Sequence, residues 1–162
     1  MSNSKSINVL INSKNAISGN TQSATYFFDW SNALNRNKQY KLHFTYLGGA
    51  NVYTGTKLPM VYLGINSNSY TTSTNGSPLT QYIGFLKPIV LVGSTNTVYL
   101  QAEDNTNLPV HLNGCPLSYT FTIEIRDNTG ALWTDNAGTP AVPADYLLNL
   151  KFIEEEEYDE ED

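Results

Sequence analysis

The sequence has little charge, a single cysteine and no long apolar run. Charged residues make up 15% of the 162 residues, against about 25% in a typical soluble protein. Ser, Thr and Asn together supply about three residues in ten, far more than average usage, so uncharged polar groups provide most of the hydration. Cys115 cannot form an internal disulfide, which excludes a cross-linked secreted scaffold and favours a reducing compartment.

The chain also lacks the signals of membrane insertion and secretion. Its longest apolar stretch, residues 82–92, is interrupted by Lys87 and Pro88 and falls short of the roughly 18 apolar residues that predict a membrane-spanning helix. The first six residues are polar and show neither the apolar core nor the cleavage site of a signal peptide. We therefore expect a protein that neither spans a membrane nor is secreted.

The net charge of −6 is unevenly distributed along the chain. Of the 15 acidic residues, eight lie between Glu154 and Asp162, so the preceding residues carry seven acidic against nine basic side chains, or +2. A nucleic-acid-binding module would show a basic surface with a Lys/Arg stripe, and none is present. The distribution predicts one domain over residues 1–153 and a flexible acidic C-terminal tail over residues 154–162.

Period-two alternation of apolar and polar residues is the dominant pattern. In residues 119–126, Tyr119, Phe121, Ile123 and Ile125 share one face while polar side chains occupy the other, as in a half-buried strand. Similar segments predict further strands at residues 7–11, 24–30, 40–47, 60–66, 97–103, 110–112 and 146–152.

Turn residues separate these segments every ten residues or so, and helical periodicity is almost absent. The sequence Asp127–Gly130 predicts a hairpin with Gly130 in the left-handed position and a short return strand carrying Trp133. Residues 31–37 permit one helical turn with Ser31 as its cap. Many short strands without crossover helices predict an all-β antiparallel sandwich or barrel.

The residues that usually carry chemistry are sparse and scattered. His43 and His111 lack neighbours with metal-ligand spacing, and Cys115 is expected to be a partly buried, inert thiol. Residues 103–107 hold clustered oxygen ligands but lack the glycine and distal glutamate of a calcium loop. We expect no catalytic residues, no metal site and no cofactor, and hence no enzyme.

Eleven tyrosines suggest either packing inside sheets or a binding surface. The alternation places Tyr26, Tyr40, Tyr46 and Tyr119 on core faces. Other tyrosines fall on outward faces or in loops, where they suit a protein interface, a sugar-stacking platform or incidental exposure. These are Tyr53, Tyr62, Tyr70 and Tyr99.

The acidic tail has two interpretations. It either adds solubilising charge or docks on a basic surface of a partner, and the low charge of the domain favours docking because interface cores are poor in charged residues. The candidate partner-contact residues are Glu154, Glu155, Glu156, Glu157, Tyr158, Asp159, Glu160, Glu161 and Asp162.

Two segments carry a resemblance to a known family. Residues 7–34, with a short strand, an Asn-Ser-Lys-Asn turn and an aromatic strand ending at Trp30, resemble the start of single jelly-roll minor capsid or penton proteins. These proteins occur in virophages, polinton-like viruses and nucleocytoplasmic large DNA viruses. Residues 107–133 followed by 145–152 resemble their closing strands, where a Pro-led strand, an alternating strand and an Asp-x-x-Gly hairpin recur.

The resemblance implies a single eight-stranded jelly roll without catalytic residues that packs into an icosahedral shell. Its partners would be copies of itself, with a pentamer favoured, and major or minor capsid proteins, in virions assembled in the host cytoplasm. Nucleic acid is not an expected direct partner. The rival hypothesis is a soluble lectin-like sandwich that stacks sugars on exposed aromatics, since the same fold hosts both functions.

Overall fold

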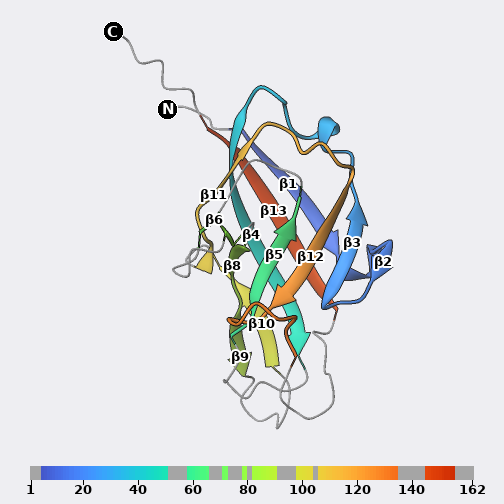
Figure 1. Cartoon of the computed structure of the whole chain (residues 1–162), viewed down its shortest axis with the longest axis vertical. Helices are drawn as coiled ribbons and strands as arrows, with labels where there is room; N and C mark the ends of the chain where they lie inside the picture. Colours follow the sequence, from blue (N-terminus) through green and yellow to red (C-terminus); the bar gives the residue numbers. More distant parts are fainter. Residues whose placement is uncertain are drawn as a thin grey trace.

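The computed structural model describes residues 5–50, 58–65, 71–72, 78–79, 82–90, 98–103, 106–134 and 145–155. This part of the chain is built almost wholly from β-strands (Figure 1). The strands before residue 80 are β1 (Ser6–Asn12), β2 (Ser18–Gly19), β3 (Ser23–Phe27), β4 (Gln39–Ala50), β5 (Met60–Gly64), β6 (Thr71–Thr72) and β7 (Pro78–Leu79). The later strands are β8 (Tyr82–Phe85), β9 (Lys87–Val90), β10 (Val98–Ala102), β11 (Val110–Asn113), β12 (Thr120–Arg126) and β13 (Tyr146–Glu154). Two single-turn 3₁₀ helices, η1 (Ser13–Asn15) and η2 (Trp30–Asn32), interrupt the first half.

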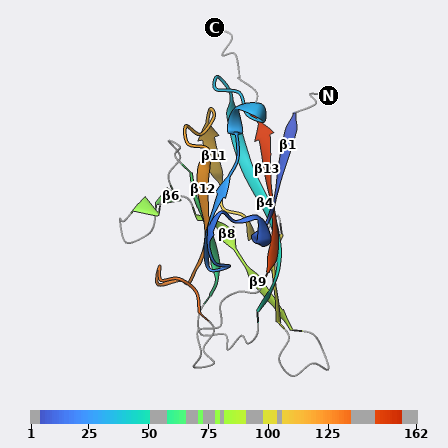
Figure 2. The ribbon, with the colours of Figure 1, turned by 90° about the vertical axis from the view of Figure 1, so that its right-hand side faces the viewer.

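Two antiparallel sheets face each other and enclose the core, as the edge-on view of Figure 2 shows. The first sheet has the strand order β1-β13-β4-β10-β9, and β11 also pairs with β4. The second has the order β2-β3-β12-β5-β8, and among the described residues β6 and β7 pair only with each other. The sandwich predicted from the alternating pattern is confirmed.

Eight of these strands form four nested antiparallel pairs. Strand β1 pairs with β13, β3 with β12, β4 with β10, and β5 with β8. In chain order these eight strands therefore pair first with eighth, second with seventh, third with sixth and fourth with fifth. Such a rolled-up arrangement divided over two sheets is a jelly roll, and the predicted eight-stranded jelly roll is confirmed.

The core is formed by the inward faces of both sheets. In β12, Phe121, Ile123 and Ile125 are buried, as the alternation predicts, and the residues between them point outward. Trp30 of η2 is fully buried between the layers, with its ring 5.1 Å from that of Phe121 and 5.7 Å from that of Phe152 on β13. Edge-on aromatic contacts of this kind add stability beyond the burial of apolar area.

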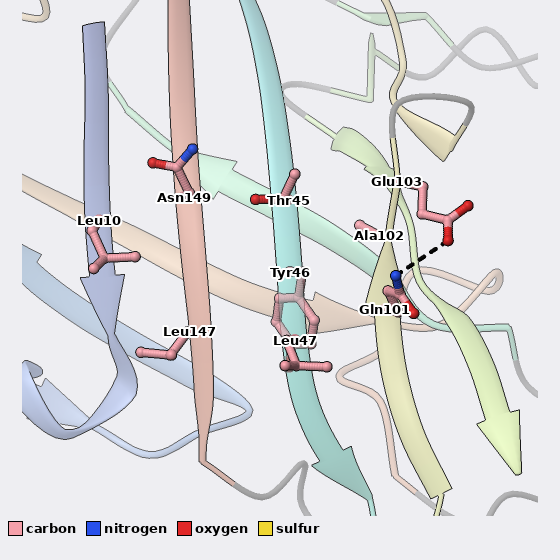
Figure 3. Close-up of a pocket in the computed structure, with 9 residues that line it drawn as sticks. All are labelled: Leu10, Thr45, Tyr46, Leu47, Gln101, Ala102, Glu103, Leu147 and Asn149. Atoms are coloured by element: carbon pink, nitrogen blue, oxygen red, sulfur yellow. Dashed lines mark hydrogen bonds between the residues drawn. The ribbon is translucent and has the colours of Figure 1, made fainter. Parts of the chain in front are cut away.

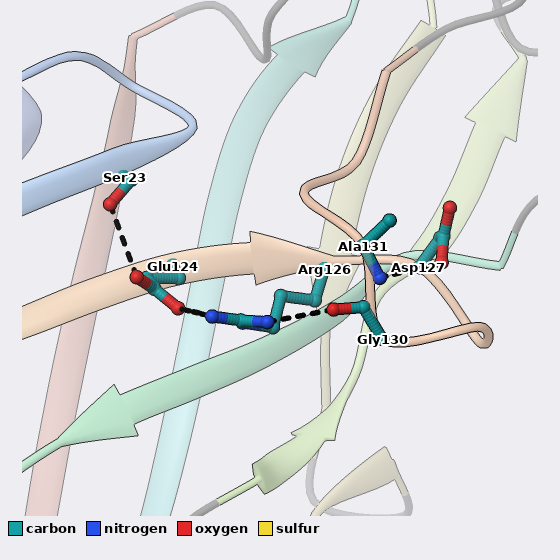
Figure 4. A network of polar contacts seen from close by, with 6 residues as sticks. All are labelled: Ser23, Glu124, Arg126, Asp127, Gly130 and Ala131. Atoms are coloured by element: carbon teal, nitrogen blue, oxygen red, sulfur yellow. Dashed lines mark hydrogen bonds and ion pairs between the residues drawn. The ribbon is translucent and has the colours of Figure 1, made fainter.

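The predicted hairpin after β12 is also confirmed (Figure 4). The buried Asp127 carboxylate accepts hydrogen bonds from the Thr129 N–H at 2.8 Å and the Ala131 N–H at 3.3 Å. Gly130 has a φ of +89°, which favours glycine, and the return segment buries Trp133. The Asp127 carboxylate thus accepts the hydrogen bonds that these backbone N–H groups would otherwise donate to water.

Three local predictions are wrong. The strand predicted over residues 24–30 ends at Phe27, because Asp29 caps a 3₁₀ turn that begins at Trp30. Tyr119 is 55% exposed instead of buried, because β12 begins at Thr120 and the Tyr119 ring lies beside that of Phe27, at 5.9 Å. The helical turn is capped by Asp29, not Ser31: the Asp29 carboxylate accepts the Ser31 N–H at 3.1 Å, so the turn begins at Trp30. A carboxylate is an equally good cap and stands two residues earlier in the chain.

The Asn107 side chain supplies backbone hydrogen bonds that no strand provides at one point along β4. Strand β10 pairs with β4 down to Tyr46 and β11 pairs with it from Leu42 onward, which leaves the backbone of Phe44 without a strand partner on that side. The Asn107 side chain accepts the Phe44 N–H at 2.6 Å and donates to the Phe44 carbonyl at 3.1 Å. One amide side chain therefore takes the place of a ladder residue.

Candidate partner-binding face

The outward side of the first sheet carries large apolar side chains. Leu10 on β1, Leu47 on β4 and Leu147 on β13 are 70%, 54% and 47% exposed, and Tyr99 on β10 is 39% exposed. Leu147 lies directly opposite Leu47 in the ladder, and Leu10 lies opposite Asn149 on the neighbouring strand. We call these four residues, Leu10, Leu47, Tyr99 and Leu147, the leucine face.

Two adjoining cavities hollow this face. One has a volume of about 460 Å³ and is walled by Leu10, Leu47 and Leu147 together with Thr45 and Gln101 (Figure 3). The other, of about 350 Å³, shares Leu47 and Leu147 and extends to Tyr99. Because the shared leucines form their common wall, the two cavities are parts of one shallow apolar groove.

The groove is bordered by amides, by the Glu103 carboxylate, which accepts a hydrogen bond from the Gln101 amide at 3.2 Å, and by one ion pair. The Asn149 side chain donates to that of Asn8 at 3.1 Å. At one end, the Lys14 ammonium lies 3.4 Å from the Asp145 carboxylate, and both side chains are mostly exposed. A polar, hydrogen-bonded border around an apolar centre has the composition of a protein interface.

The predicted tail residues begin at the other end of the same sheet. Glu154 is the last residue of β13, where its N–H donates to the Lys5 carbonyl at 3.0 Å and its carboxylate lies 3.4 Å from the Lys38 ammonium. Glu155 donates its N–H to the Gln39 carbonyl at 2.9 Å, and its carboxylate lies 3.0 Å from the His111 ring.

Through these hydrogen bonds and side-chain contacts, Glu154 and Glu155 are attached to the jelly roll. The other candidate residues, Glu156, Glu157, Tyr158, Asp159, Glu160, Glu161 and Asp162, lie outside the described residues. Eight residues separate Leu147 from Glu155 along an extended strand, a distance of about 26 Å at about 3.3 Å per residue. The start of the tail and the leucine face are therefore separate regions of the molecule.

The outward tyrosines have different surroundings. Tyr62 is half-buried, with the Arg126 guanidinium 5.3 Å from its ring centre and the Tyr82 ring 5.8 Å away. Tyr99 belongs to the leucine face, whereas Tyr53 and Tyr70 lie outside the described residues. Of the predicted outward tyrosines in the described part, only Tyr99 offers a ring that no other aromatic or guanidinium group contacts.

The described structure does not place the candidate catalytic and metal-binding residues next to one another. Among the described residues, no group of three or more His, Cys, Asp and Glu side chains is placed to hold a metal ion. Cys115 is partly buried, as predicted, and burial raises the pKa of its thiol, which disfavours the reactive thiolate. In the same ranges, no helix has the length and apolar character needed to cross a bilayer.

Comparison with known proteins gives little further information. No family model matches the chain, and no curated protein matches it. Among solved structures it is similar to the tripod from the baseplate of bacteriophage Tuc2009, with 14% sequence identity and a TM-score of 0.29. The alignment covers 93% of this chain and 64% of that one, so this chain spans less than two thirds of the tripod chain's length. A TM-score this low does not define a common fold, and the jelly roll is assigned from the strand order alone.

The leucine face was not predicted from the sequence, although a signal for it exists. Leu10, Leu47 and Leu147 each stand at a position where the alternation of their strand calls for a polar residue. Leu10, for example, falls between the buried Val9 and Ile11. An apolar residue out of phase with its strand marks an exposed apolar site.

Proposed function

We propose that the protein is a non-enzymatic structural component of a virus particle. In this proposal it is a single jelly-roll capsid protein, a penton or minor capsid protein, that self-associates as a pentamer and packs with the major capsid protein. It would be assembled in the host cytoplasm and reside in the virion. The jelly roll is common among capsid and lectin domains, but a fold does not define a function, so the leucine face is the observation that supports the proposal.

Exposed leucines favour a covered surface. Removing a leucine side chain from water contributes roughly 1.5–3 kcal/mol when it becomes fully buried, and three of them adjoin on this face with 47–70% exposure. A partner that covers the groove buries these side chains, while the nearby Lys14 and Asp145 already face each other at 3.4 Å and the Glu103 carboxylate accepts a hydrogen bond from Gln101. Neighbouring capsid subunits are the partners we propose.

The tail provides a second and different contact. Glu154 and Glu155 fix the exit of the chain at the end of the sheet remote from the leucine face. The carboxylates that follow in the sequence suit a Lys/Arg-rich surface on a neighbouring subunit. One subunit can then make an apolar contact at one end of the sheet and a salt-sensitive contact at the other.

A carbohydrate-binding function is the second candidate, and one observation favours it. Phe27 and Tyr119 are 62% and 55% exposed, and their ring centres lie 5.9 Å apart at one tip of the second sheet. Exposed aromatic rings of this kind can stack on sugars. This function needs no assembly, so it differs from the first proposal in a measurable way.

The mass of the full-length protein in solution, together with electron micrographs, tests the proposal. We expect a concentration-dependent species of pentamer size or larger, visible as rings. Leu47→Lys should abolish this species, because it places an ammonium in the apolar groove, while the melting temperature changes little. Thr120→Lys, the same change on the outward side of β12, is the matched control and should assemble normally.

A wild-type chain that stays monomeric at all concentrations overturns the capsid proposal. If that monomer is retained on a glycan array and Tyr119→Ala abolishes retention, the carbohydrate-binding function replaces it. Assembly that Leu47→Lys leaves intact overturns the role of the leucine face.

A further inference from the structure

Strand β1 is an edge strand of the first sheet. In the described part of the chain it pairs only with β13, and the bond from the Glu154 N–H to the Lys5 carbonyl shows which backbone groups point toward β13. Because the direction of these groups alternates along an antiparallel strand, the N–H and C=O groups of Ser6, Asn8, Leu10 and Asn12 point away from the sheet. Asn12 is the N-cap of η1, so its carbonyl is used by that turn, and within the described ranges no strand pairs with the outward groups of Ser6, Asn8 and Leu10.

The strands at the other ends of the two sheet orders, β9, β2 and β8, carry features that hinder strand pairing. Strand β9, at the opposite edge of the same sheet, contains Lys87 and Pro88. In the second sheet, β2 has only two residues and ends at Gly19, and β8 has four residues with a register shift in its pairing with β5. Charge, proline, shortness and bulges are the means by which proteins protect their edges from other chains.

Strand β1 has none of these protections. It is seven residues long and regular, and it contains neither proline nor a charged side chain. Its outward side chains are Ser6, Asn8, Leu10 and Asn12, of which Leu10 is 70% exposed. An unprotected, uncharged edge with an exposed leucine is suited to pairing with another strand.

We propose that β1 pairs antiparallel with β1 of a second copy of this chain, which joins the two first sheets into one. A second copy fits because the edge is complementary to itself. With Asn8 opposite the partner's Leu10, the outward N–H and C=O groups of these two residues bond to each other in pairs. Ser6 then lies opposite the partner's Asn12, whose N–H meets the Ser6 carbonyl, and no like charges oppose each other within the strand. Such a two-fold contact uses the same surface on both chains.

This pairing goes beyond the proposed function and also extends its binding face. A two-fold axis perpendicular to the joined sheet keeps both outward sides on the same side of the dimer. The leucine faces of two copies then lie on one continuous sheet, with Leu10 of each chain at the junction (Figure 3 shows its position beside Leu147). A partner covering the dimer would meet a doubled apolar surface.

The first test removes one backbone donor from the edge. Asn8→Pro deletes an N–H that β13 does not use, and proline is tolerated on edge strands, so the chain should fold with a nearly unchanged melting temperature. We expect its dimer dissociation constant, measured by sedimentation of the full chain, to rise at least about tenfold. Asn8→Ala, which keeps the N–H, is the matched control and should dimerise like the wild type.

The second test determines the register and does not depend on tolerance of proline. In a Cys115→Ser background, chains with Asn8→Cys are mixed under oxidising conditions with size-tagged chains carrying Leu10→Cys. Opposite residues in a hydrogen-bonded antiparallel pair have Cα atoms about 5.5 Å apart, which suits a disulfide. We expect mixed disulfide dimers, and few from either variant alone, because like positions are offset by two residues along the strand.

The results separate this inference from the proposed function. If mixed disulfides fail to form and Asn8→Pro associates like Asn8→Ala, the β1 pairing is overturned, even when pentamer-sized rings are present. If the disulfide dimer forms but no larger species appears, the β1 pairing stands and the pentameric capsid role fails. Disulfides that form more readily between identical variants than between the mixed chains overturn the proposed register.

Discussion

On the outward sides of the two sheets, the polar side chains around Arg126 and the apolar side chains of the leucine face differ in whether they already have partners within the chain. On the second sheet, the Arg126 guanidinium lies 2.6 Å from the Glu124 carboxylate and donates to the Gly130 carbonyl at 2.7 Å (Figure 4). It also lies over the Tyr62 ring, 5.3 Å from its centre. Glu124 also accepts the Ser23 hydroxyl at 3.2 Å. On the first sheet, the leucine face offers three half- to largely exposed leucines.

This difference indicates which of these two surfaces, the polar network around Arg126 or the leucine face, gains from a partner. A polar network whose members bond to one another gains little from being covered, and its desolvation has a cost. Exposed apolar side chains gain from burial and lose no hydrogen bonds. We therefore expect changes on the second sheet to alter the stability of the single chain, and changes on the leucine face to alter association instead.

The largest expected effect is on the inner side of the second sheet. Phe121→Ala should lower the free energy of unfolding by roughly 3–5 kcal/mol, the range for aromatic residues truncated in a core, because Phe121 packs against both Trp30 and Tyr26. Thr122→Ala, the next residue on the opposite side of the strand, should cost little. Urea unfolding of both variants checks the register, and equal losses would contradict it.

A smaller effect is expected from the polar network. Arg126→Ala removes hydrogen bonds to Glu124 and to the Gly130 carbonyl and should lower the free energy of unfolding by about 1.5–3 kcal/mol, as for bonds to charged groups. Leu10→Ala on the leucine face should change it by about 0.5 kcal/mol or less, because Leu10 is 70% exposed. If the two variants lose equal stability in thermal unfolding, the contrast between the two sides is wrong.

Much of the fold was predictable because alternation directly reports which side of a strand is buried. The hairpin at Asp127–Gly130 was equally readable, since its carboxylate and its glycine act within a few residues. The burial of Tyr119 was mispredicted because extending the alternation by one residue ignored where β12 begins. Similarly, Asp29 and Ser31 are both good N-cap residues and stand two positions apart. The sequence alone does not show which of them caps the 3₁₀ turn η2.

The candidate face was not predictable in the same way. Leu10, Leu47 and Leu147 are separated by 37 and 100 positions in the chain, and only the pairing of β1, β13 and β4 places them together. The tail was found from charge alone, but the contacts of Glu154 and Glu155 depend on Lys38 and His111. Adjacency across a sheet depends on strand order, which alternation does not encode.

Beneath the leucine face, two buried tyrosines should respond differently to loss of their hydroxyl groups. The Tyr146 hydroxyl lies 2.8 Å from that of Tyr26, whereas the Tyr46 hydroxyl has no hydrogen-bond partner in the described structure. Tyr146→Phe should therefore cost about 1 kcal/mol and Tyr46→Phe about nothing. Urea unfolding at neutral pH distinguishes them, and a larger loss for Tyr46→Phe would contradict the assignment.

The same tyrosines predict a loss of stability at high pH. Burial raises the pKa of Tyr26, Tyr46 and Tyr146 above the ordinary value of 10.0. The unfolded chain therefore releases these protons first, so their contribution to stability is complete below about pH 10 and is lost as the pH rises above it. The free energy of unfolding should fall more steeply above pH 10 in the wild type than in Tyr46→Phe, and equal slopes would contradict burial of that hydroxyl.

The smallest effects on stability are expected at the acidic end of the chain. Glu154→Gln and Glu155→Gln should each lower the free energy of unfolding by less than about 1 kcal/mol, because the contacts of these carboxylates with the Lys38 ammonium and the His111 ring are partly exposed. Deleting residues 156–162 should leave the melting temperature unchanged, since seven residues with six carboxylates repel one another and favour an extended chain.

Association should respond to the same deletion in a way that distinguishes the two ends of the sheet. Contacts of the acidic residues with a basic neighbour are screened over about 8 Å at 0.15 M salt, so raising salt should weaken wild-type assembly toward the level of the deletion variant. The leucine contact is apolar and should persist at high salt. If the deletion variant assembles like the wild type at both low and high salt, the acidic residues serve only solubility, and the leucine face alone must account for the assembly.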